Sequence, residues 1–273
     1  MAKEGYDLEV LGNLARKAGK AILEVYESDF EVARKADSSP LTLADQRSHE
    51  LIAAELQSLY PQIPVLSEEG KEAPYAIRKA WPAFWLVDPL DGTKEFVKRN
   101  GEFSVNIALI EGTLPTIGII YLPVLDRLFV AHARQGCWEI AGGRERRLQV
   151  ADSLPAGAIR VLKSRSHPSP DLEVLLKILP FHESVVRGSA LKFCAIAAGE
   201  ADFYPRIGPT WEWDTAAGQA IVTAAGGVMV DLKGQPFAYN KPSLVNGPFL
   251  VASSDTWLKQ SGILQEALKL SSK

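Results

Sequence analysis

The chain has 273 residues, of which 47% are hydrophobic, and its 30 Lys and Arg against 33 Asp and Glu give a net charge of −3. This composition predicts a soluble globular protein with a core large enough to fold without disulfides, as one large domain or as two closely packed ones. The slight negative charge argues against a broad electrostatic surface for nucleic acid, so an anionic substrate must meet local positive charge.

The first half of the chain begins with helical patterns and continues with strands. Apolar residues recur at three- and four-residue intervals from Asp7 to Ser28, which predicts an amphipathic helix, and a second helix is expected from about Ala44 to Leu59. Short strands are expected at Ile63–Leu66 and Phe84–Val87. After Gly101, turn signals separate four apolar runs that predict an antiparallel meander: FSVNIALIEG, PTIGIIYLP, RLFVAHA and CWEIAG.

Beyond Asp152, strands alternate with helices, which is typical of a layered α/β arrangement. The expected strands are IRVLKS, ESVVR, ADFYP and VMVD, and the expected helices between them are DLEVLLKIL, ALKFCAIAAG and DTAAGQAIVTAAG. A last helix is expected near Asp255–Leu270. We therefore predict two halves, 1–150 and 151–273, coupled closely enough to act as one functional unit.

The cysteines and the first residues indicate a compartment. Cys137 and Cys194 lie far apart in apolar surroundings, which favours buried free thiols in a reducing cytoplasm over a disulfide. The start, MAKEGYDLEV, lacks the basic and apolar segments of a signal peptide, and no apolar run approaches the roughly 18 residues that span a bilayer. We expect neither secretion nor a transmembrane segment.

The most informative stretch is AFWLVDPLDGTKEF at residues 83–96. An apolar run that reads as a buried strand ends in Asp88 and Asp91, so two carboxylates leave the core together. Pro89 forces a turn and leaves the carbonyl of Leu90 available as a further oxygen ligand. Oxygen ligands suit Mg²⁺, whereas zinc and softer metals prefer His or Cys.

The residues after this turn suit an anion. Gly92 lets the backbone approach a ligand closely, and the N–H groups of Gly92 and Thr93 can bind an anion if a helix begins here. Lys94 adds positive charge nearby. Taken alone, however, an Asp-Gly pair is more often a simple turn after a strand.

Other acidic residues also have two interpretations. Glu68 and Glu69 follow a short strand, so they could share a cleft with Asp88 if the two strands are neighbours, or they could form a solvated turn. Asp45 and Asp214 could contribute to a site or simply cap helices.

The histidines do not suggest zinc, because His49, His132, His167 and His182 show none of the spacings of a zinc site. His167 lies in a polar, basic loop, KSRSHP, that could contact an anionic ligand or be ordinary surface. Neither a Gly-x-Ser-x-Gly elbow nor a Walker-type glycine loop occurs, which disfavours a serine hydrolase and a P-loop protein.

Three segments together resemble the inositol monophosphatase-like superfamily of lithium-sensitive, magnesium-dependent phosphatases. They are Glu68-Glu69, DPLDGT at 88–93 and WDTAAG at 213–218, in the order that the superfamily has them, and the similarity runs from about Pro40 to Asp231. The resemblance implies an αβαβα sandwich with an antiparallel sheet in the N-terminal half and a smaller mixed or parallel sheet in the C-terminal half. Trp211 departs from the pattern, because a small residue is expected there.

The resemblance implies a site with two or three Mg²⁺ ions. Glu68, Asp88 and the Leu90 carbonyl would hold one ion, and Asp88, Asp91 and Asp214 would hold a second. The ions would straddle the scissile phosphate, and the second would stabilise the leaving oxygen.

Catalytic roles are implied for Asp45, Glu68 and Thr93. Asp45 and Thr93 would orient and deprotonate a metal-bound water for in-line attack on phosphorus, without a covalent phosphoenzyme. The N–H groups of Gly92 and Thr93 would bind phosphate oxygens.

Within the superfamily, LVDPLDGTKEF, LKSRSH, GSALKFC and ADFYPRIGPTWEWDTAAGQA are most like the bacterial 3'(2'),5'-bisphosphate nucleotidases. This similarity implies nucleotide contacts from His167, Ser189, Lys192 and Arg206, with Lys192 and Arg206 suited to a second phosphate. The other implied substrate contacts are Glu68, Leu90, Asp91, Gly92, Thr93 and Asp214. From the sequence alone, Ser189 could instead cap a helix and Lys192 could lie on a solvated face.

The implied reaction converts adenosine 3',5'-bisphosphate to AMP and phosphate, which clears a by-product of sulfate assimilation in the cytoplasm. An inositol or sugar monophosphatase of the same superfamily, and a catalytically silent nucleotide-binding regulator, stay as alternatives. The expected partner is the small-molecule substrate and not nucleic acid. A monomer and a homodimer both stay open, as does peripheral association with the cytoplasmic face of the inner membrane.

Overall fold

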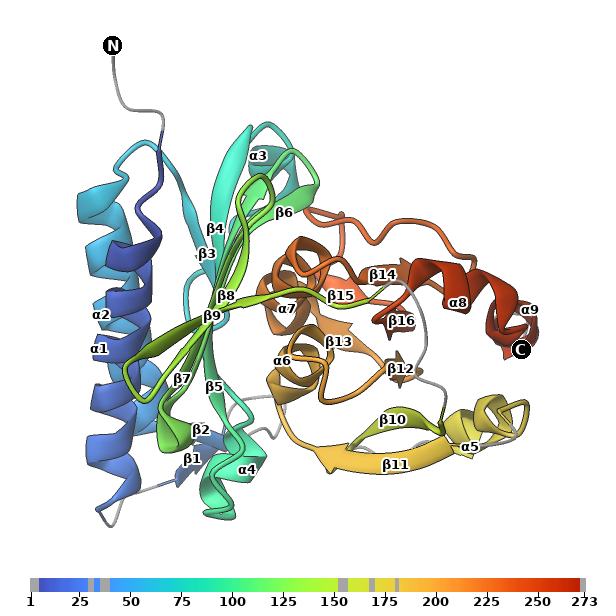
Figure 1. The fold of residues 1–273 in the computed structure, drawn as a ribbon. Helices are drawn as coiled ribbons and strands as arrows, with labels where there is room; N and C mark the ends of the chain where they lie inside the picture. The colour runs from blue at the N-terminus through green and yellow to red at the C-terminus, as the bar shows by residue number, and fades with distance from the viewer. Residues whose placement is uncertain are drawn as a thin grey trace.

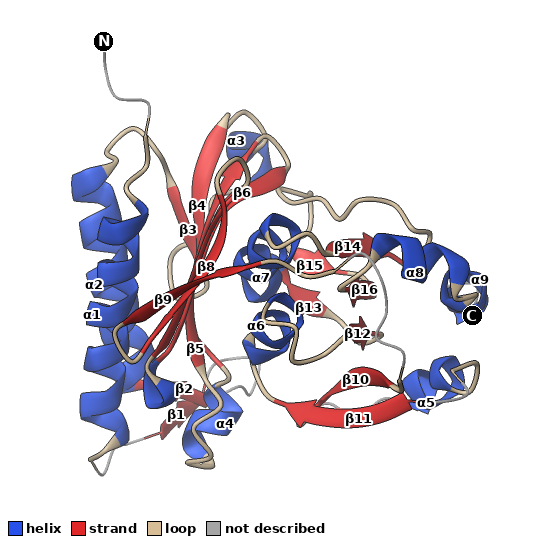
Figure 2. Ribbon diagram, in the orientation of Figure 1, coloured by secondary structure: helices blue, strands red, loops and turns tan. Residues whose placement is uncertain are grey.

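The computed structural model describes residues 5–28, 32–34, 40–151, 157–166, 170–179 and 182–270. Helices and sheets alternate in five layers: a helix pair, a large sheet, a second helix pair, a smaller sheet, and a last group of helices (Figure 1). Figure 2 shows the same layers by type of secondary structure. The predicted αβαβα sandwich is confirmed.

The helices are α1 (Leu8–Tyr26), α2 (Leu43–Leu59), α3 (Tyr75–Arg78), α4 (Thr93–Val97), the 3₁₀ helix η1 (Pro123–Leu125), α5 (Pro170–Leu176), α6 (Leu191–Ala197), α7 (Glu212–Ala224), α8 (Asp255–Gln260) and α9 (Ile263–Leu270). The strands of the large sheet are β3 (Val65–Ser67), β4 (Ala83–Asp91), β5 (Ser104–Glu111), β6 (Leu114–Leu122), β7 (Arg127–His132), β8 (Gly136–Ala141) and β9 (Arg144–Leu148). The smaller sheet contains β10 (Ile159–Ser164), β11 (His182–Arg187), β12 (Phe203–Arg206), β14 (Val228–Asp231) and β16 (Phe249–Ala252). Two short pairs complete the described strands: β1 (Val32–Arg34) with β2 (Pro40–Thr42), and β13 (Thr210–Trp211) with β15 (Val245–Asn246).

The large sheet follows chain order from β3 to β9. Only its first pair, β3 and β4, is parallel, and the remaining pairs form the predicted antiparallel meander. Strand β9, with the sequence RERRL, was not predicted, because four of its five residues are charged and exposed and so show no alternation with apolar residues.

The outer helix pair covers one face of this sheet (Figure 1). Helix α1 begins after Asp7, whose carboxylate accepts hydrogen bonds from the N–H groups of Glu9 and Val10 at 3.0 and 3.1 Å. Such N-terminal capping satisfies donors that the helix itself cannot pair. The predicted apolar stripe of α1 is buried against the sheet together with part of α2.

The inner helix pair, α6 and α7, lies between the two sheets (Figure 1). Small residues let α7 approach its neighbours closely: a Cβ added at Gly118 of β6 would lie 2.5 Å from the carbonyl oxygen of Ala217, and one added at Gly218 would lie 2.3 Å from the ring of Phe193. The small-residue run in α7 therefore serves close packing, as expected from the sequence.

The smaller sheet has the order β11-β10-β12-β16-β14 and is mixed, as predicted. β10 is parallel to β11 and β12, whereas β16 is antiparallel to β12 and β14. Strand β16 was not predicted. Helices α8 and α9 were predicted as a single helix, which the structure interrupts at Gly262, where φ is 78°.

Among the residues that the structure describes, no helix is both long enough and apolar enough to cross a bilayer. Cys137 and Cys194 are both buried free thiols, as predicted.

Candidate active site

The parallel pairing of β3 and β4 places the end of β3 beside Val87 of β4. Ser67 is in register with Val87, and the N–H of Glu68 donates a hydrogen bond to the Val87 carbonyl at 3.1 Å. Because the two strands run in the same direction, Glu68, which directly follows β3, lies beside Asp88, which belongs to the last part of β4. The expectation that these strands are neighbours is confirmed.

The predicted turn at Pro89 is wrong, because strand β4 continues through the DPLD residues to Asp91, and this part of the strand is held by hydrogen bonds from two sides. The N–H of Leu90 donates to Asp88 Oδ1 at 3.1 Å, and Ser48 Oγ of α2 donates to the Pro89 carbonyl at 2.8 Å. The register with β5 shifts between Asp88 and Asp91, which marks a bulge. Both carboxylates are therefore presented by one fixed piece of backbone.

Gly92 allows the chain to enter helix α4 directly after β4. Its φ is 92°, a left-handed conformation that residues with a Cβ adopt at a cost, and an added Cβ would lie 3.0 Å from the Glu102 carbonyl oxygen. Helix α4 then begins at Thr93. The N–H groups of Gly92 and Thr93 were expected to bind an anion if a helix begins here. The structure meets this condition.

Asp214 lies in the first turn of α7, where it can act both as a helix cap and as a ligand. Its Oδ2 accepts the N–H of Trp211, the residue before the helix, at 2.8 Å. Asp214 is thus a capping residue, as the simpler interpretation predicted. It also lines the same cleft as Glu68 and Asp88, so capping does not exclude a role as a ligand.

Glu68, Asp88 and Asp214 form a compact acidic cluster. One potential ligand atom from each lies within 4.8 Å of the others. Burial raises the pKa of Asp88 well above its usual range, and the negative charges of Glu68 and Asp91 raise it further. Burial followed by the charge of Asp91 likewise raises the pKa of Asp214. A cation would relieve this repulsion, and the oxygen donors suit a hard one.

Asp91 is held by serines. Ser189 Oγ donates to Asp91 Oδ2 at 2.5 Å, and Ser189 Oγ lies 2.7 Å from Ser104 Oγ. Ser189 has a φ of 48° and lies outside α6, because the N-cap position of this helix is occupied by Ala190. The alternative of Ser189 as a helix cap is therefore wrong.

Asp45 lies behind the cleft rather than on its wall. It is fully buried in the first turn of α2, and its charge contributes to the raised pKa of Asp88. Asp45 is thus near the acidic cluster, although it is not among the residues that line the cleft.

The cleft has a volume of about 230 Å³ and brings most of the predicted residues together. Those on its wall are Glu68, Asp88, Leu90, Asp91, Gly92, Thr93, Ser189, Lys192, Arg206 and Asp214. His167 lies outside the described residues. Just before it, Ser164 lines the cleft and Arg165 forms an ion pair with Glu102 at 2.6 Å.

The cleft also contains positive charge. Lys192 is only 5% exposed, which contradicts the alternative of a solvated face; its Nζ donates to the Ser189 carbonyl and lies 5.4 Å from the centre of the Tyr204 ring. Burial lowers the pKa of Lys192 to about 8, against the opposing effect of Asp91. Arg206 is half-buried, and its Nη2 donates to the Pro209 carbonyl at 3.1 Å.

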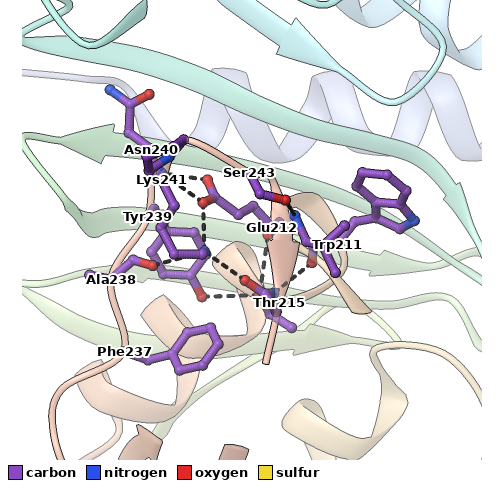
Figure 3. A network of polar contacts seen from close by, with 12 residues as sticks. Trp211, Glu212, Thr215, Phe237, Ala238, Tyr239, Asn240, Lys241 and Ser243 are labelled. Carbon is purple, nitrogen blue, oxygen red and sulfur yellow. Dashed lines mark hydrogen bonds and ion pairs between the residues drawn. The ribbon is translucent and has the colours of Figure 1, made fainter. Parts of the chain in front are cut away.

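A polar network fixes the start of α7, as Figure 3 shows. Glu212 is 0% exposed, and its carboxylate accepts hydrogen bonds from the N–H groups of Asn240 and Lys241 and from Lys241 Nζ at 2.6–3.0 Å. Lys241 Nζ also donates to Asn246 Oδ1 at 2.9 Å, and Asn246 Nδ2 donates to Thr215 Oγ1 at 3.0 Å. The residues around Asp214 are thereby tied to the loop that precedes β15.

Several lining residues were missed by the sequence analysis: Phe193, Tyr204, Thr210, Thr215 and Phe249. Aromatic residues in apolar runs, and single threonines such as Thr210 and Thr215, give no signal in the sequence that separates the wall of a cleft from the core. Trp211 was noted only as a departure, and the structure places it on the wall.

Comparisons with known proteins show the family of the chain. The chain matches the model of the inositol monophosphatase family over residues 6–271. It is 47% identical to the 3'(2'),5'-bisphosphate nucleotidase CysQ of Salmonella typhimurium over 89% of this chain and 98% of that protein, and 45% identical to CysQ of Escherichia coli K12 over 90% and 99%. Among solved structures, CysQ of Bacteroides thetaiotaomicron superposes with a TM-score of 0.79 at 41% identity, covering 90% of this chain and 98% of that one. The chain therefore belongs to the inositol monophosphatase family.

Proposed function

We propose that this protein is a Mg²⁺-dependent phosphatase that hydrolyses the 3'-phosphate of adenosine 3',5'-bisphosphate to AMP and phosphate. The observation that carries the proposal is that one cleft contains both the acidic cluster and a buried lysine beside Arg206. An acidic cluster suits a cation and the phosphate it attracts, whereas the separate positive charge suits a second phosphate.

The acidic residues fit Mg²⁺. Their donors are all oxygens, and burial, followed by the negative charges of neighbouring carboxylates, raises the pKa of Asp88 and of Asp214, which a bound cation would counter. Glu68, Asp88 and the Leu90 carbonyl would hold one ion, and Asp88, Asp91 and Asp214 a second. Bound Mg²⁺ supplies Lewis-acid chemistry: it neutralises charge on the phosphate and lowers the pKa of water.

The chain's own residues orient the reactants. The Thr93 hydroxyl lines the cleft and would position a water molecule for in-line attack, and the Asp45 carboxylate, buried near the acidic cluster but not on the cleft wall, would take the proton by way of that hydroxyl. The N–H groups of Gly92 and Thr93 donate hydrogen bonds to phosphate oxygens. Because Ser189 and Ser104 hold Asp91, this side of the cleft needs little rearrangement when substrate binds.

The second phosphate of the substrate binds Lys192 and Arg206. Lys192 is nearly inaccessible to water, so its charge is poorly solvated and gains more from a phosphate than an exposed lysine would. His167 and Ser189 contribute further nucleotide contacts. The names of the relatives support this substrate, because those proteins are 3'(2'),5'-bisphosphate nucleotidases.

We place the enzyme in the cytoplasm, where its two buried thiols stay reduced. Its partner is the small-molecule nucleotide. The division into halves 1–150 and 151–273 stays a prediction, as does the choice between monomer and homodimer.

A substrate panel tests the proposed function. With Mg²⁺, the purified protein is expected to release phosphate from adenosine 3',5'-bisphosphate with a kcat/KM at least tenfold above that for inositol 1-phosphate, because only the first substrate occupies Lys192 and Arg206 with a second phosphate. The reverse preference would assign the protein to the inositol monophosphatases. Tight nucleotide binding without turnover would instead support the catalytically silent regulator.

A further inference from the structure

Trp211, at a position where the resemblance leads us to expect a small residue, lies on the wall of the cleft. Its side chain is 41% exposed, and its ring is stacked parallel to that of Trp213, with the ring centres 5.0 Å apart and the planes 6° apart. Trp213 is buried, so one face of the Trp211 ring covers it. The other face of the indole is left for solvent or for a ligand in the cleft.

The backbone of Trp211 is fixed on both sides. Its N–H donates to Asp214 Oδ2 at 2.8 Å, and its carbonyl accepts a hydrogen bond from Asn246 Nδ2 at 2.8 Å. Asn246 is in turn held by Lys241, which pairs with the buried Glu212 (Figure 3). A large exposed side chain normally loses conformational freedom when it binds a ligand. The Trp211 side chain is already restricted by its stack on Trp213 and by the two hydrogen bonds of its backbone.

The neighbours of Trp211 connect it to both phosphate positions. Asp214, three residues later, belongs to the acidic cluster. Arg206, five residues earlier, donates hydrogen bonds from Nε and Nη2 to the carbonyls of Gly208 and Pro209, and so holds the short segment that leads to Trp211. One short stretch of chain thus presents a cation for phosphate, a flat aromatic surface and a metal-ligating carboxylate.

We infer that Trp211 forms a stacking platform for the purine base of the substrate and makes this chain selective for nucleotides over other phosphate esters. This inference rests on the proposed function. Every nucleobase has a flat π-face that can stack on an indole ring, whereas the saturated ring of an inositol or a sugar has none. Trp213 supports the platform from behind, and the Glu212–Lys241–Asn246 network holds its backbone in place.

Two substrates that differ only in the base test the inference. They are adenosine 3',5'-bisphosphate and its abasic analogue, 1,2-dideoxyribose 3,5-bisphosphate, each measured with wild-type protein, Trp211→Ala and Trp211→Phe. Trp211→Ala is expected to lower kcat/KM for the nucleotide about tenfold to a hundredfold and for the abasic analogue by at most about twofold. Trp211→Phe, which keeps an aromatic face, is expected to recover most of the loss.

Val245→Ala is the matched control. Val245 pairs with Trp211 in the β13–β15 ladder and is 40% exposed, but it is not among the residues that line the cleft. This variant is expected to leave both substrates unaffected. An equal loss on both substrates in Trp211→Ala would show a structural role, and no loss, or an equal effect from Val245→Ala, would also overturn the inference.

Binding of AMP separates this inference from the proposed function. AMP carries the base but is a product, so its binding is measured by calorimetry without turnover. We expect Trp211→Ala to weaken AMP binding about tenfold or more. If wild-type protein prefers inositol phosphate, the proposed function fails; AMP binding then decides the inference, and affinity that does not depend on Trp211 refutes it.

Discussion

Lys192 is a charged residue in an almost completely buried position. A carbonyl oxygen and the face of an aromatic ring are the contacts of its ammonium group, and neither carries a full negative charge. Desolvation of a lysine favours its neutral form, which explains why the pKa falls from 10.5 to about 8. Between these two pH values the unfolded chain binds the proton more tightly than the folded protein, so this residue makes stability rise with pH in that window.

The lowered pKa of Lys192 predicts a pH-dependent preference for bisphosphates. As pH rises through about 8, the free enzyme loses the charge that binds the second phosphate, so the kcat/KM for adenosine 3',5'-bisphosphate should fall relative to that for 3'-AMP. The ratio of the two values, measured from about pH 6.5 to 9.5, isolates this effect from titrations that affect both substrates. In Lys192→Met the ratio should be low and independent of pH. A wild-type ratio that stays constant would contradict the assignment of Lys192 to the second phosphate.

At the scale of elements, α7 is the helix on which the site depends. It lies between the two sheets, packs against β5 and β6 through small residues, and carries Asp214 in its first turn (Figure 1). The sequence predicted the helix and its small-residue face from composition. It did not predict that Phe193 of α6 would fill the space opposite Gly218, because that contact depends on tertiary packing.

Substitution of Gly218 by Ala should destabilise the protein by about 1–3 kcal/mol, although alanine favours a helix. The added Cβ would lie 2.3–2.8 Å from ring atoms of the buried Phe193, and the cost of this overlap exceeds the gain in helix propensity. Urea unfolding measures the change. In a Phe193→Leu background the loss should be smaller. Gly157→Ala, where nothing lies within 4 Å, should change stability by less than about 0.5 kcal/mol.

At the scale of the whole molecule, the acidic cluster joins three distant parts of the chain: the ends of β3 and β4 and the start of α7. In the absence of a cation these carboxylates repel one another, and burial strengthens the repulsion. The fold therefore contains a site whose charge opposes folding until metal binds.

Replacement of Asp88 by Asn should raise the stability of the metal-free protein and remove most of the stabilisation by Mg²⁺. The carbonyl oxygen of the new amide side chain can still accept the Leu90 N–H and keep the local backbone conformation, but the substitution removes one buried charge. In a chelator the variant should melt about 2–8 °C above wild type, because about 1–2 kcal/mol of repulsion is lost. Mg²⁺ should raise the melting temperature of wild type and have little effect on the variant. Equal stabilisation of both by Mg²⁺ would argue against Asp88 as a ligand.

The sequence predicted the layers and most of the site because both follow from local signals. Asp88 and Asp91 end an apolar run, and Asp214 opens a helix of small residues, so their positions can be inferred without a structure. The remaining features depend on contacts between distant segments. The bond from Ser189 to Asp91, the burial of Lys192 and the stacking of Trp211 on Trp213 leave no periodic trace in the sequence.

The position of β16 has a consequence for synthesis of the protein. This strand lies between β12 and β14 and pairs with both, yet it comes near the end of the chain. The smaller sheet can therefore close behind α6 and α7 only after residue 252 has left the ribosome. Until then β12, which carries Arg206, lacks one of its two neighbouring strands, so this wall of the cleft is incomplete.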